Sequence, residues 1–329
     1  MNLDVQRACA IEAVLRASKV CTRVQNELLS EGTHTKADAS PVTVADYAAQ
    51  AIVNHLLSEQ TTDFAIVAEE ESGALRQPTN HALRRAVINA VQSSLPTLSD
   101  ISAIDAIDIG QCDGLDRSMY WTLDPIDGTK GFLRRDQYAV ALALIVDGQV
   151  ELGVLGCPNL PLDPNGPHGE RGCLFIASRG KGTVVRGLTS AAERPIRVSN
   201  ITDPSHARLC ESVEKAHSSQ SQSAQVAKLL GIEHEPHRID SQCKYGAVAR
   251  GEASIYLRLP TRKDYIEKIW DHAAGVCVIE EAGGMVSDIH GSPLDFSCGR
   301  LLENNTGVIV TNKHLHAAVV ESVGCVLGL

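Results

Sequence analysis

Two acidic residues lie on either side of a proline turn in the segment Asp124-Pro125-Ile126-Asp127-Gly128-Thr129. Proline fixes its own φ and glycine permits a tight turn, so the two carboxylates are held near each other. Magnesium prefers carboxylate oxygens combined with water and substrate phosphate, which makes this segment a candidate cation site. Gly128 and Thr129 follow directly, and their backbone N–H groups and the Thr129 hydroxyl are suited to phosphate.

Three more acids occupy the expected ends of elements, where rigid scaffolds present functional groups. Glu69 follows the apolar stretch 64–68, Asp271 begins a predicted helix, and Asp46 lies in the first turn of another. Each has a purely structural interpretation when taken singly. Glu69 fits a solvated acidic run, Asp271 a helix N-cap, and Asp46 a capping box with Thr43.

A single metal centre accounts for all five acids together. Carboxylates that converge repel one another unless cations lie between them. Two metal ions about 3.5–4 Å apart can activate a water molecule and stabilise the leaving oxygen of an in-line displacement. The set therefore predicts a centre of the kind that cleaves phosphate esters.

The composition limits the possible partners and compartment. The 329 residues carry 30 basic and 40 acidic side chains, for a formal charge of -10. Nucleic-acid polymers are bound mainly through Lys and Arg, so we expect no such partner. The ten cysteines are scattered without a C-x-x-C pair, and we find neither a secretory signal nor an apolar run of about 20 residues. We expect a cytoplasmic protein with reduced thiols and no membrane association.

The elements that position the acids follow from hydrophobic spacing. In the first half, helices and strands are mixed, and Asp147-Gly148 indicates a β-hairpin. Residues 72–117 form a polar insertion, and the strand that follows it is expected to stop at Asp124. The predicted helices are 3–29, 41–58, 81–95 and 98–107, and the predicted strands are 64–68, 119–123, 138–146, 150–156, 173–177 and 183–186.

Strand and helix patterns alternate in the second half, after a proline-containing segment at 195–204. We therefore expect an α+β protein with an N-terminal α+β domain over residues 1–198 and a C-terminal α/β domain over residues 199–329. The predicted strands of the second half are 206–213, 236–239 and 254–259, and the predicted helices are 222–230, 272–282 and 313–326.

The ordered motifs resemble the Li⁺-sensitive, Mg²⁺-dependent phosphatase superfamily of inositol monophosphatase and fructose-1,6-bisphosphatase. Within it the chain is most similar to the 3′(2′),5′-bisphosphate nucleotidases, from about residue 3 to residue 326. The superfamily motifs are Trp121–Thr129 and Trp270–Gly275. The stretches that resemble the nucleotidases are Ser40–Tyr47, Val67–Glu70, Lys130–Arg134, Ser241–Gly246 and Tyr256–Pro260.

This resemblance implies a layered αβαβα fold of the sugar-phosphatase kind and two or three Mg²⁺ ions, with Li⁺ as an inhibitor. It implies that Asp46 and Thr129 form the catalytic pair, in which Asp46 accepts from the Thr129 hydroxyl and Thr129 activates the attacking water. The implied metal ligands are Glu69, Asp124, Asp127, Asp271 and the carbonyl oxygen of Ile126.

The resemblance also implies a small nucleotide substrate. Its nucleotide contacts fall on His217, Ser241, Lys244 and Arg258, and Lys244 and Arg258 are suited to the 5′-phosphate because they are cations in an acidic chain. The implied reaction is hydrolysis of 3′-phosphoadenosine 5′-phosphate to AMP and phosphate, with 3′-phosphoadenosine 5′-phosphosulfate as a second substrate. The alternatives are an inositol polyphosphate 1-phosphatase and a non-catalytic nucleotide sensor. We expect a monomer.

Three positions add detail to this pattern. Ala68 stands where the superfamily usually has glycine before the metal-binding glutamate. Glu70 is the alternative ligand if the motif is read one residue later. Cys243 stands where we expect alanine, and a redox role for its thiol is a hypothesis that requires an accessible thiolate.

Overall fold

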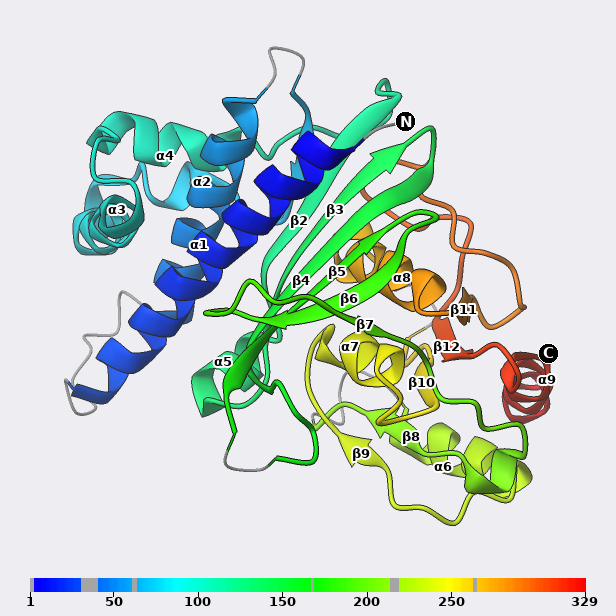
Figure 1. The fold of residues 1–329 in the computed structure, drawn as a ribbon. Coiled ribbons are helices and arrows are strands. Elements are labelled where there is room, and N and C mark those ends of the chain that lie inside the picture. Colours follow the sequence, from blue (N-terminus) through cyan, green and yellow to red (C-terminus); the bar gives the residue numbers. More distant parts are fainter. Residues whose placement is uncertain (1–2, 31–40, 61–63, 167–168, 214–218, 263–264) are drawn as a thin grey trace.

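The computed structural model describes residues 3–30, 41–60, 64–166, 169–213, 219–262 and 265–329. Its described elements form five layers (Figure 1): outer helices, a large sheet, central helices, a small sheet and a last helical layer. Three clusters of buried apolar residues fill the spaces between these layers. The predicted αβαβα architecture is confirmed.

The first sheet has seven strands in the order β1-β2-β3-β4-β5-β6-β7. β1 pairs with β2 in parallel, and each later neighbour pairs antiparallel. The parallel pair matters for the site because it brings Glu69 and Asp124 to the same edge. The strands are β1 (Ile66–Ala68), β2 (Met119–Asp127), β3 (Ala139–Val146), β4 (Gln149–Pro161), β5 (Arg171–Ser178), β6 (Gly182–Gly187) and β7 (Arg194–Ile196).

Four helices lie on the outer side of this sheet. The long helices α1 (Asp4–Ser30) and α2 (Pro41–Ser58) pack on each other and on the strands, and α3 (His81–Ser94) and α4 (Asp100–Asp108) pack mainly on α2. Figure 1 shows α3 and α4 beyond α1 and α2, away from the second sheet. The 72–117 insertion is thus part of the outer layer.

The two faces of β3 carry side chains of different size. Leu142 and Leu144 belong to the cluster under α1 and α2, whereas Ala141 and Ala143 belong to the cluster that includes the central helices. Side chains alternate along a strand, so one face is filled by leucines and the other stays shallow. The shallow face admits the helix α8 (Ala273–Glu281) close to the sheet.

The second sheet has five strands in the order β11-β12-β10-β8-β9. The central helices α7 (Cys243–Ala249) and α8 lie between the two sheets, and α6 (Gln220–Leu229) and α9 (His316–Leu327) form the last layer. The strands are β8 (Leu209–Glu211), β9 (His237–Arg238), β10 (Ile255–Arg258), β11 (Gly284–Ser287) and β12 (Val308–Asn312).

Three local predictions are wrong. β2 continues past Asp124 to Asp127, with a register shift between these residues where the proline interrupts regular pairing. Helix α2 spans Pro41–Ser58, as predicted, but Asp46 therefore lies in its second turn and Thr43 lies inside the helix, which rules out the capping box. Asp271 ends the short 3₁₀-helix η4 (Ile269–Asp271) and is not the N-cap of α8, which is His272.

Several short elements were not predicted. These are α5 (Thr129–Arg134), α7, β7, β11, β12 and the 3₁₀-helices η1 (Ser72–Ala74), η2 (Pro78–Asn80), η3 (Pro204–His206) and η4. The predicted division after residue 198 lies between β7 and β8, which belong to different sheets. The division itself stays a prediction. The two halves are in contact, since α8 from the second half packs on strands of the first sheet. Within the described residues, no helix has the length and apolar character needed to cross a membrane.

The close approach of α8 to α7 depends on Gly275. A Cβ atom at this position would lie 2.3 Å from the ring of Tyr245, which is buried. We expect Gly275→Ala to lower the free energy of unfolding by about 1–3 kcal/mol, because the two helices must move apart. The control is Gly324→Ala in α9, where a Cβ meets nothing within 4 Å. Urea unfolding checks both, and equal stability of the two variants would contradict the packing argument.

Candidate active site

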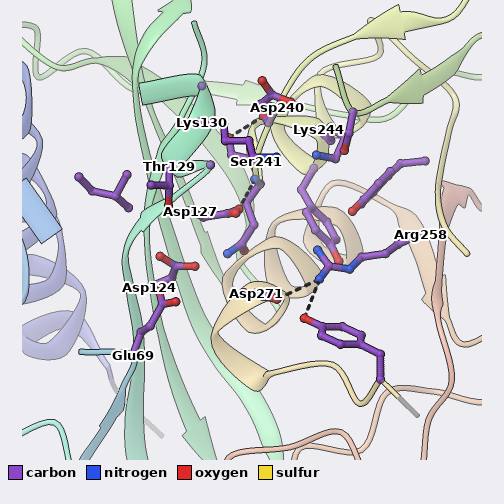
Figure 2. Close-up of a pocket in the computed structure, with 18 residues that line it drawn as sticks. Glu69, Asp124, Asp127, Thr129, Lys130, Asp240, Ser241, Lys244, Arg258 and Asp271 are labelled. Atoms are coloured by element: carbon purple, nitrogen blue, oxygen red, sulfur yellow. Dashed lines mark hydrogen bonds and ion pairs between the residues drawn. The ribbon is translucent and has the colours of Figure 1, made fainter. Parts of the chain in front are cut away.

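A cavity of about 360 Å³ opens where β1, β2, α5, α7, β10 and η4 meet. Figure 2 shows Glu69, Asp124 and Asp127 on one side of it and Lys244 and Arg258 on the other, with Asp271 next to Arg258. Ten of the predicted site residues line this cavity: Glu69, Asp124, Ile126, Asp127, Gly128, Thr129, Ser241, Lys244, Arg258 and Asp271. Segments far apart in the sequence therefore meet at one place.

The four predicted acidic ligands come from three segments. Glu69 directly follows β1, Asp124 and Asp127 lie on β2, and Asp271 ends η4. The register shift in β2 lets both of its acids line the cavity, together with Ile126 between them. In a regular strand, residues three apart point to opposite faces, so the bulge is what unites the pair.

Asp124 is the most enclosed of these acids, with 3% of its surface exposed. Burial raises its pKa well above the ordinary value, and the charges of Glu69, Asp127 and Asp271 add to this. Its Oδ1 atom is buried and accepts no hydrogen bond from any described residue. A buried carboxylate oxygen without a donor requires another positive partner.

The pKa values of the neighbouring acids Glu69 and Asp127 are raised as well. Burial, the charge of Asp271 and the charge of Glu70 raise the pKa of Glu69 to about 8. Burial and Asp271 raise the pKa of Asp127 to about 6, although Lys244, Arg258 and the Gln242 N–H act in the other direction. Repulsion between carboxylates is therefore the main electrostatic feature of this side of the cavity.

The donor set fits Mg²⁺. It consists of oxygen atoms only, it carries the orphaned Oδ1 of Asp124, and its carboxylates repel one another without a cation. The residues suited to hold the ions are Glu69, Asp124, Asp127, Asp271 and the Ile126 carbonyl.

Asp46 lies behind the cavity wall, on α2, and does not line the cavity itself. It is buried, and burial together with the charges of Glu70 and Glu69 raises its pKa well above the ordinary value. Its charge in turn raises the pKa of Asp124. The predicted hydrogen bond from the Thr129 hydroxyl is not among the contacts of the described residues and stays a prediction.

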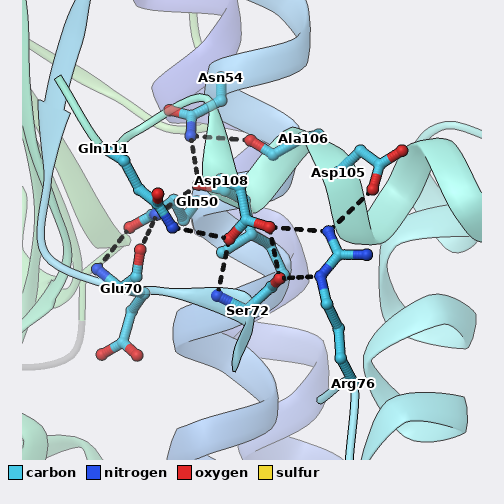
Figure 3. A network of polar contacts seen from close by, with 10 residues as sticks. Gln50, Asn54, Glu70, Ser72, Arg76, Asp105, Ala106, Asp108 and Gln111 are labelled. Carbon is cyan, nitrogen blue, oxygen red and sulfur yellow. Dashed lines mark hydrogen bonds and ion pairs between the residues drawn. The ribbon is translucent and has the colours of Figure 1, made fainter. Parts of the chain in front are cut away.

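Gln50 on α2 holds the chain next to Glu69. Its side chain donates to the Glu70 carbonyl at 2.6 Å and to the Ile107 carbonyl at 2.9 Å, and accepts from the Glu70 N–H at 2.9 Å (Figure 3). Asp108 of α4 extends this network to the backbone and hydroxyl of Ser72. Because both backbone groups of Glu70 are engaged, Glu69 is the acid presented to the cavity, and the alternative ligand Glu70 is not part of its lining.

The opposite side of the cavity carries two cations, the buried Lys244 and the partly buried Arg258. The ammonium group of Lys244 lies 5.1 Å from the centre of the Tyr256 ring, and burial lowers its pKa. Nη2 of Arg258 lies 2.7 Å from Glu267 and 3.1 Å from Asp271. These cations face Glu69, Asp124 and Asp127 across the cavity (Figure 2), and Arg258 also pairs with Asp271, so the negative and positive ends meet at this ion pair.

Arg258 is held by a chain of buried polar groups. The Tyr245 hydroxyl lies 2.7 Å from Nδ1 of His272, whose Nε2 lies 3.2 Å from Glu267. Burial acts to raise the pKa of Glu267, but the hydrogen bond with His272 and the charge of Arg258 lower it to about 2. Glu267, Asp271 and His272 are close enough to hold a metal, but the guanidinium already supplies the positive charge there.

Close packing shapes the wall between the two ends. Ser241 has a left-handed backbone with φ of 64°, which is uncommon for a residue with a side chain. Gly128 also has a positive φ of 91°, and a Cβ there would lie 2.8 Å from the Cβ of Ser241. Glycine is therefore required where the turn after Asp127 meets the start of α7.

The sequence did not reveal every residue of the cavity. Tyr256 lies on a predicted strand, and Gln242 lies inside a quoted motif, but Tyr265 gave no signal. His217 lies outside the described residues. Cys243 is fully buried, and its Sγ lies 3.3 Å from the Tyr138 carbonyl, so the accessible thiolate that a redox role requires is absent. The cavity residues that we did not predict as site residues are Lys130, Gly131, Ser212, Asp240, Gln242, Tyr245, Tyr256 and Tyr265.

The raised pKa values predict how Mg²⁺ affects stability. The folded, metal-free protein binds the protons of Glu69 and Asp127 more tightly than the unfolded chain does. This contribution is fully present below about pH 4 and is lost as the pH rises through about 6 and then about 8. We expect the free energy of unfolding in EDTA to fall over this range, and saturating Mg²⁺ to oppose the fall.

Urea unfolding across this pH range, with and without Mg²⁺, measures the effect. Asp127→Asn should lose part of the stability gain that Mg²⁺ gives at high pH, whereas Asp116→Asn, at an exposed loop position, should keep this gain. A stability gain from Mg²⁺ that does not grow with pH would contradict the assignment of these carboxylates to the metal.

Comparison with known proteins shows which family the chain resembles. The pattern of the inositol monophosphatase family matches residues 2–327. A 3′(2′),5′-bisphosphate nucleotidase of Oryza sativa is 44% identical over 96% of this chain and 92% of its own length. One from Schizosaccharomyces pombe is 42% identical over 99% of this chain and 97% of its own length.

Solved structures share the fold. An inositol monophosphatase from Anabaena has a TM-score of 0.64 at 22% identity, covering 98% of this chain and 96% of its own. CysQ from Bacteroides thetaiotaomicron, a bacterial member of the same family, has a TM-score of 0.63 at 22% identity, covering 95% and 99%. The matched family pattern and the nearly full-length relatives lead to one conclusion: the chain belongs to the inositol monophosphatase family.

Proposed function

We propose that the protein is a Mg²⁺-dependent 3′(2′),5′-bisphosphate nucleotidase. It hydrolyses the 3′-phosphate of 3′-phosphoadenosine 5′-phosphate, releasing AMP and phosphate, and it accepts 3′-phosphoadenosine 5′-phosphosulfate as a second substrate. Relatives that are 42–44% identical over nearly the whole chain are named 3′(2′),5′-bisphosphate nucleotidases, which supports this reaction.

The observation that carries the proposal is the division of charge in the cavity. Glu69, Asp124 and Asp127 line one end, the buried Lys244 and the partly buried Arg258 line the other, and the fourth acid, Asp271, lies 3.1 Å from Arg258. A substrate with one phosphate has no use for the second end. A nucleotide with phosphates at both the 3′ and 5′ positions fills both, with the 3′-phosphate at the metals and the 5′-phosphate at the cations.

The metal would be held by Glu69, Asp124, Asp127, Asp271 and the Ile126 carbonyl. When bound, it supplies the positive charge that lowers the pKa of a water molecule and offsets the charge of the leaving oxygen. We assign two or three ions to this centre, and we assign Li⁺ inhibition to competition for it. Gly128 and Thr129 direct backbone N–H groups toward the 3′-phosphate.

Thr129 and Asp46 handle the proton of the attacking water. The Thr129 hydroxyl accepts a proton from the water while its own proton passes to Asp46, and the water oxygen forms the new bond to phosphorus. The bond from phosphorus to the 3′ oxygen breaks, and that oxygen takes up a proton from solvent. Burial raises the pKa of Asp46, which makes its carboxylate a stronger base for this proton transfer.

The nucleotide end uses His217, Ser241, Lys244 and Arg258. Arg258 offers a planar fork to the 5′-phosphate, and Glu267 holds that fork in place. Lys244 adds a point charge between the Tyr256 ring and the cavity.

We place the protein in the cytoplasm as a monomer that acts on small molecules. All ten cysteines are free thiols, and six of them are fully buried, which suits a reducing compartment. Sedimentation at working concentrations tests the monomer, and localisation of a tagged chain tests the compartment.

The substrate is tested by measuring phosphate release from three compounds under one set of conditions. We expect 3′-phosphoadenosine 5′-phosphate to have a kcat/KM at least about tenfold above that of inositol 1,4-bisphosphate, because each well-placed charge-assisted contact contributes about 1.5–3 kcal/mol. 3′-Phosphoadenosine 5′-phosphosulfate should also be cleaved. Preference for the inositol compound would instead support the polyphosphate 1-phosphatase, and AMP binding without any turnover would support the nucleotide sensor.

Thr129→Ala tests the proton path. Loss of the hydroxyl should lower kcat by about 10²–10⁴-fold, while AMP binding changes far less, because general-base help is needed only in the reaction. Thr129→Ser keeps the hydroxyl and is the matched control, expected to retain most of the rate. Equal losses in kcat and in AMP affinity for Thr129→Ala would make this residue a binding group rather than part of the proton path.

A further inference from the structure

Gln242 lies between the two segments that carry Asp127 and Asp271. It is 2% exposed and immediately precedes α7. Its backbone N–H donates to Oδ2 of Asp127. Its side chain donates from Nε2 to the Trp270 carbonyl at 2.8 Å and accepts at Oε1 from the Gly275 N–H at 3.1 Å.

The two side-chain contacts lie on either side of Asp271. Trp270 is the residue before it in η4, and Gly275 lies in the first turn of α8. One residue therefore contacts a proposed metal ligand on β2 directly and the backbone around a second ligand through its amide. These two segments are 144 residues apart, since Asp271 and Asp127 differ by that number.

The contact acts against an electrostatic force. Asp127 and Asp271 are carboxylates that line the same cavity, and like charges repel each other. A third negatively charged side chain between them would increase this repulsion. A primary amide is neutral and offers both a donor and an acceptor at one end, so it can engage a carbonyl and an N–H together.

The backbone conformation of Ser241, just before Gln242, also helps to orient the Gln242 N–H group. Ser241 holds a left-handed φ of 64°, and its hydroxyl accepts from the Cys243 N–H at 3.2 Å. Such a backbone costs on the order of 1 kcal/mol and persists only where the surroundings enforce it. This conformation directs the Gln242 N–H toward Asp127.

We propose that Gln242 is a positioning residue of the metal centre, whose amide sets the separation between Asp127 and Asp271 so that both reach the same cation. The proposal rests on the Mg²⁺ centre of the proposed function. It assigns Gln242 no contact with the reacting atoms. Its effect is on the affinity for metal, before any substrate binds.

The test measures Mn²⁺ binding to the whole protein without substrate, from the loss of the free-ion signal in electron paramagnetic resonance. Gln242→Met keeps the volume of the side chain and removes both amide contacts. We expect it to weaken Mn²⁺ binding by about 10- to 100-fold, as loss of an outer-shell partner typically does. Gln242→Glu keeps the shape and the acceptor but loses the donor to Trp270 when ionised, and should also weaken binding at least severalfold.

The matched control is Asn305→Leu. Asn305 is a buried amide whose side chain makes three hydrogen bonds, to Asp288, Pro293 and Asp295, and none of these residues lines the cavity. Urea unfolding of the metal-free proteins compares the loss of stability. Comparable destabilisation with normal Mn²⁺ affinity in Asn305→Leu, against weakened affinity in Gln242→Met, separates positioning from a general structural role.

Two reference measurements make each outcome decisive. Wild type should bind Mn²⁺ and Asp127→Asn should bind it much more weakly; if wild type does not bind, the metal centre itself and the proposed function fail. If wild type binds and a folded Gln242→Met or Gln242→Glu has a Kd within twofold of it, the positioning role alone is overturned. Since Gln242→Glu differs from wild type by one group, it decides the question if Gln242→Met does not fold.

Discussion

Mutual repulsion among carboxylates that converge on the buried Asp124 is the constraint on which the rest of this structure depends. Asp124 is nearly inaccessible to water, yet it faces Glu69, Asp127 and Asp271. Burial and, after it, the charges of the neighbouring carboxylates raise its pKa, because both favour the protonated form when no cation is bound. A fold that keeps these residues together must draw stability from elsewhere, and the three apolar clusters between its layers are where that stability lies.

The acids are held by elements that come from separate parts of the chain. β1 and β2 share a parallel pairing, the bulge in β2 turns two acids to one side, and η4 approaches from the second half of the chain. Small residues make the last approach possible, because a Cβ at Gly153 would lie 2.6 Å from the Ala274 carbonyl of α8. The position of Asp271 is thus determined by the packing of a helix on a sheet, at residues that have no chemistry of their own.

This division explains what could be predicted from the sequence. The turn at Asp124–Thr129 is a local signal, since proline, glycine and two acids in six residues define both a shape and a chemistry. The long elements have clear periodicity, and the predicted positions of α1, α2, β3 and α8 agree with the structure to within a few residues. The bulge in β2 was missed because it arises from pairing with β3, which no pattern within 119–127 reports.

The residues that act through contacts were the hardest to find. Gln242, Glu267 and Tyr245 carry neither an unusual spacing nor a position at the end of a predicted element. Their roles come from partners far away in the sequence, such as the carbonyl of Trp270 for Gln242 and Arg258 for Glu267. The structure also separates Glu69 from Glu70, which the sequence left as alternatives, because Gln50 binds the backbone of the second and leaves the first to line the cavity.

The net negative charge of the protein contrasts with the two cations in the cavity. With a formal charge of -10, the surface as a whole repels polyanions. In the proposed function a small bisphosphate is different, because the buried Lys244 and the partly buried Arg258 would act on it in a cavity where salt screens little. Arg258 also pairs with Asp271, so the cation that would bind substrate at one end compensates a carboxylate of the other. A metal ion bound to Asp271 would neutralise this carboxylate in place of Arg258, and the guanidinium would then be available to the 5′-phosphate. Metal binding and 5′-phosphate binding would thus be coupled through the ion pair between Arg258 and Asp271.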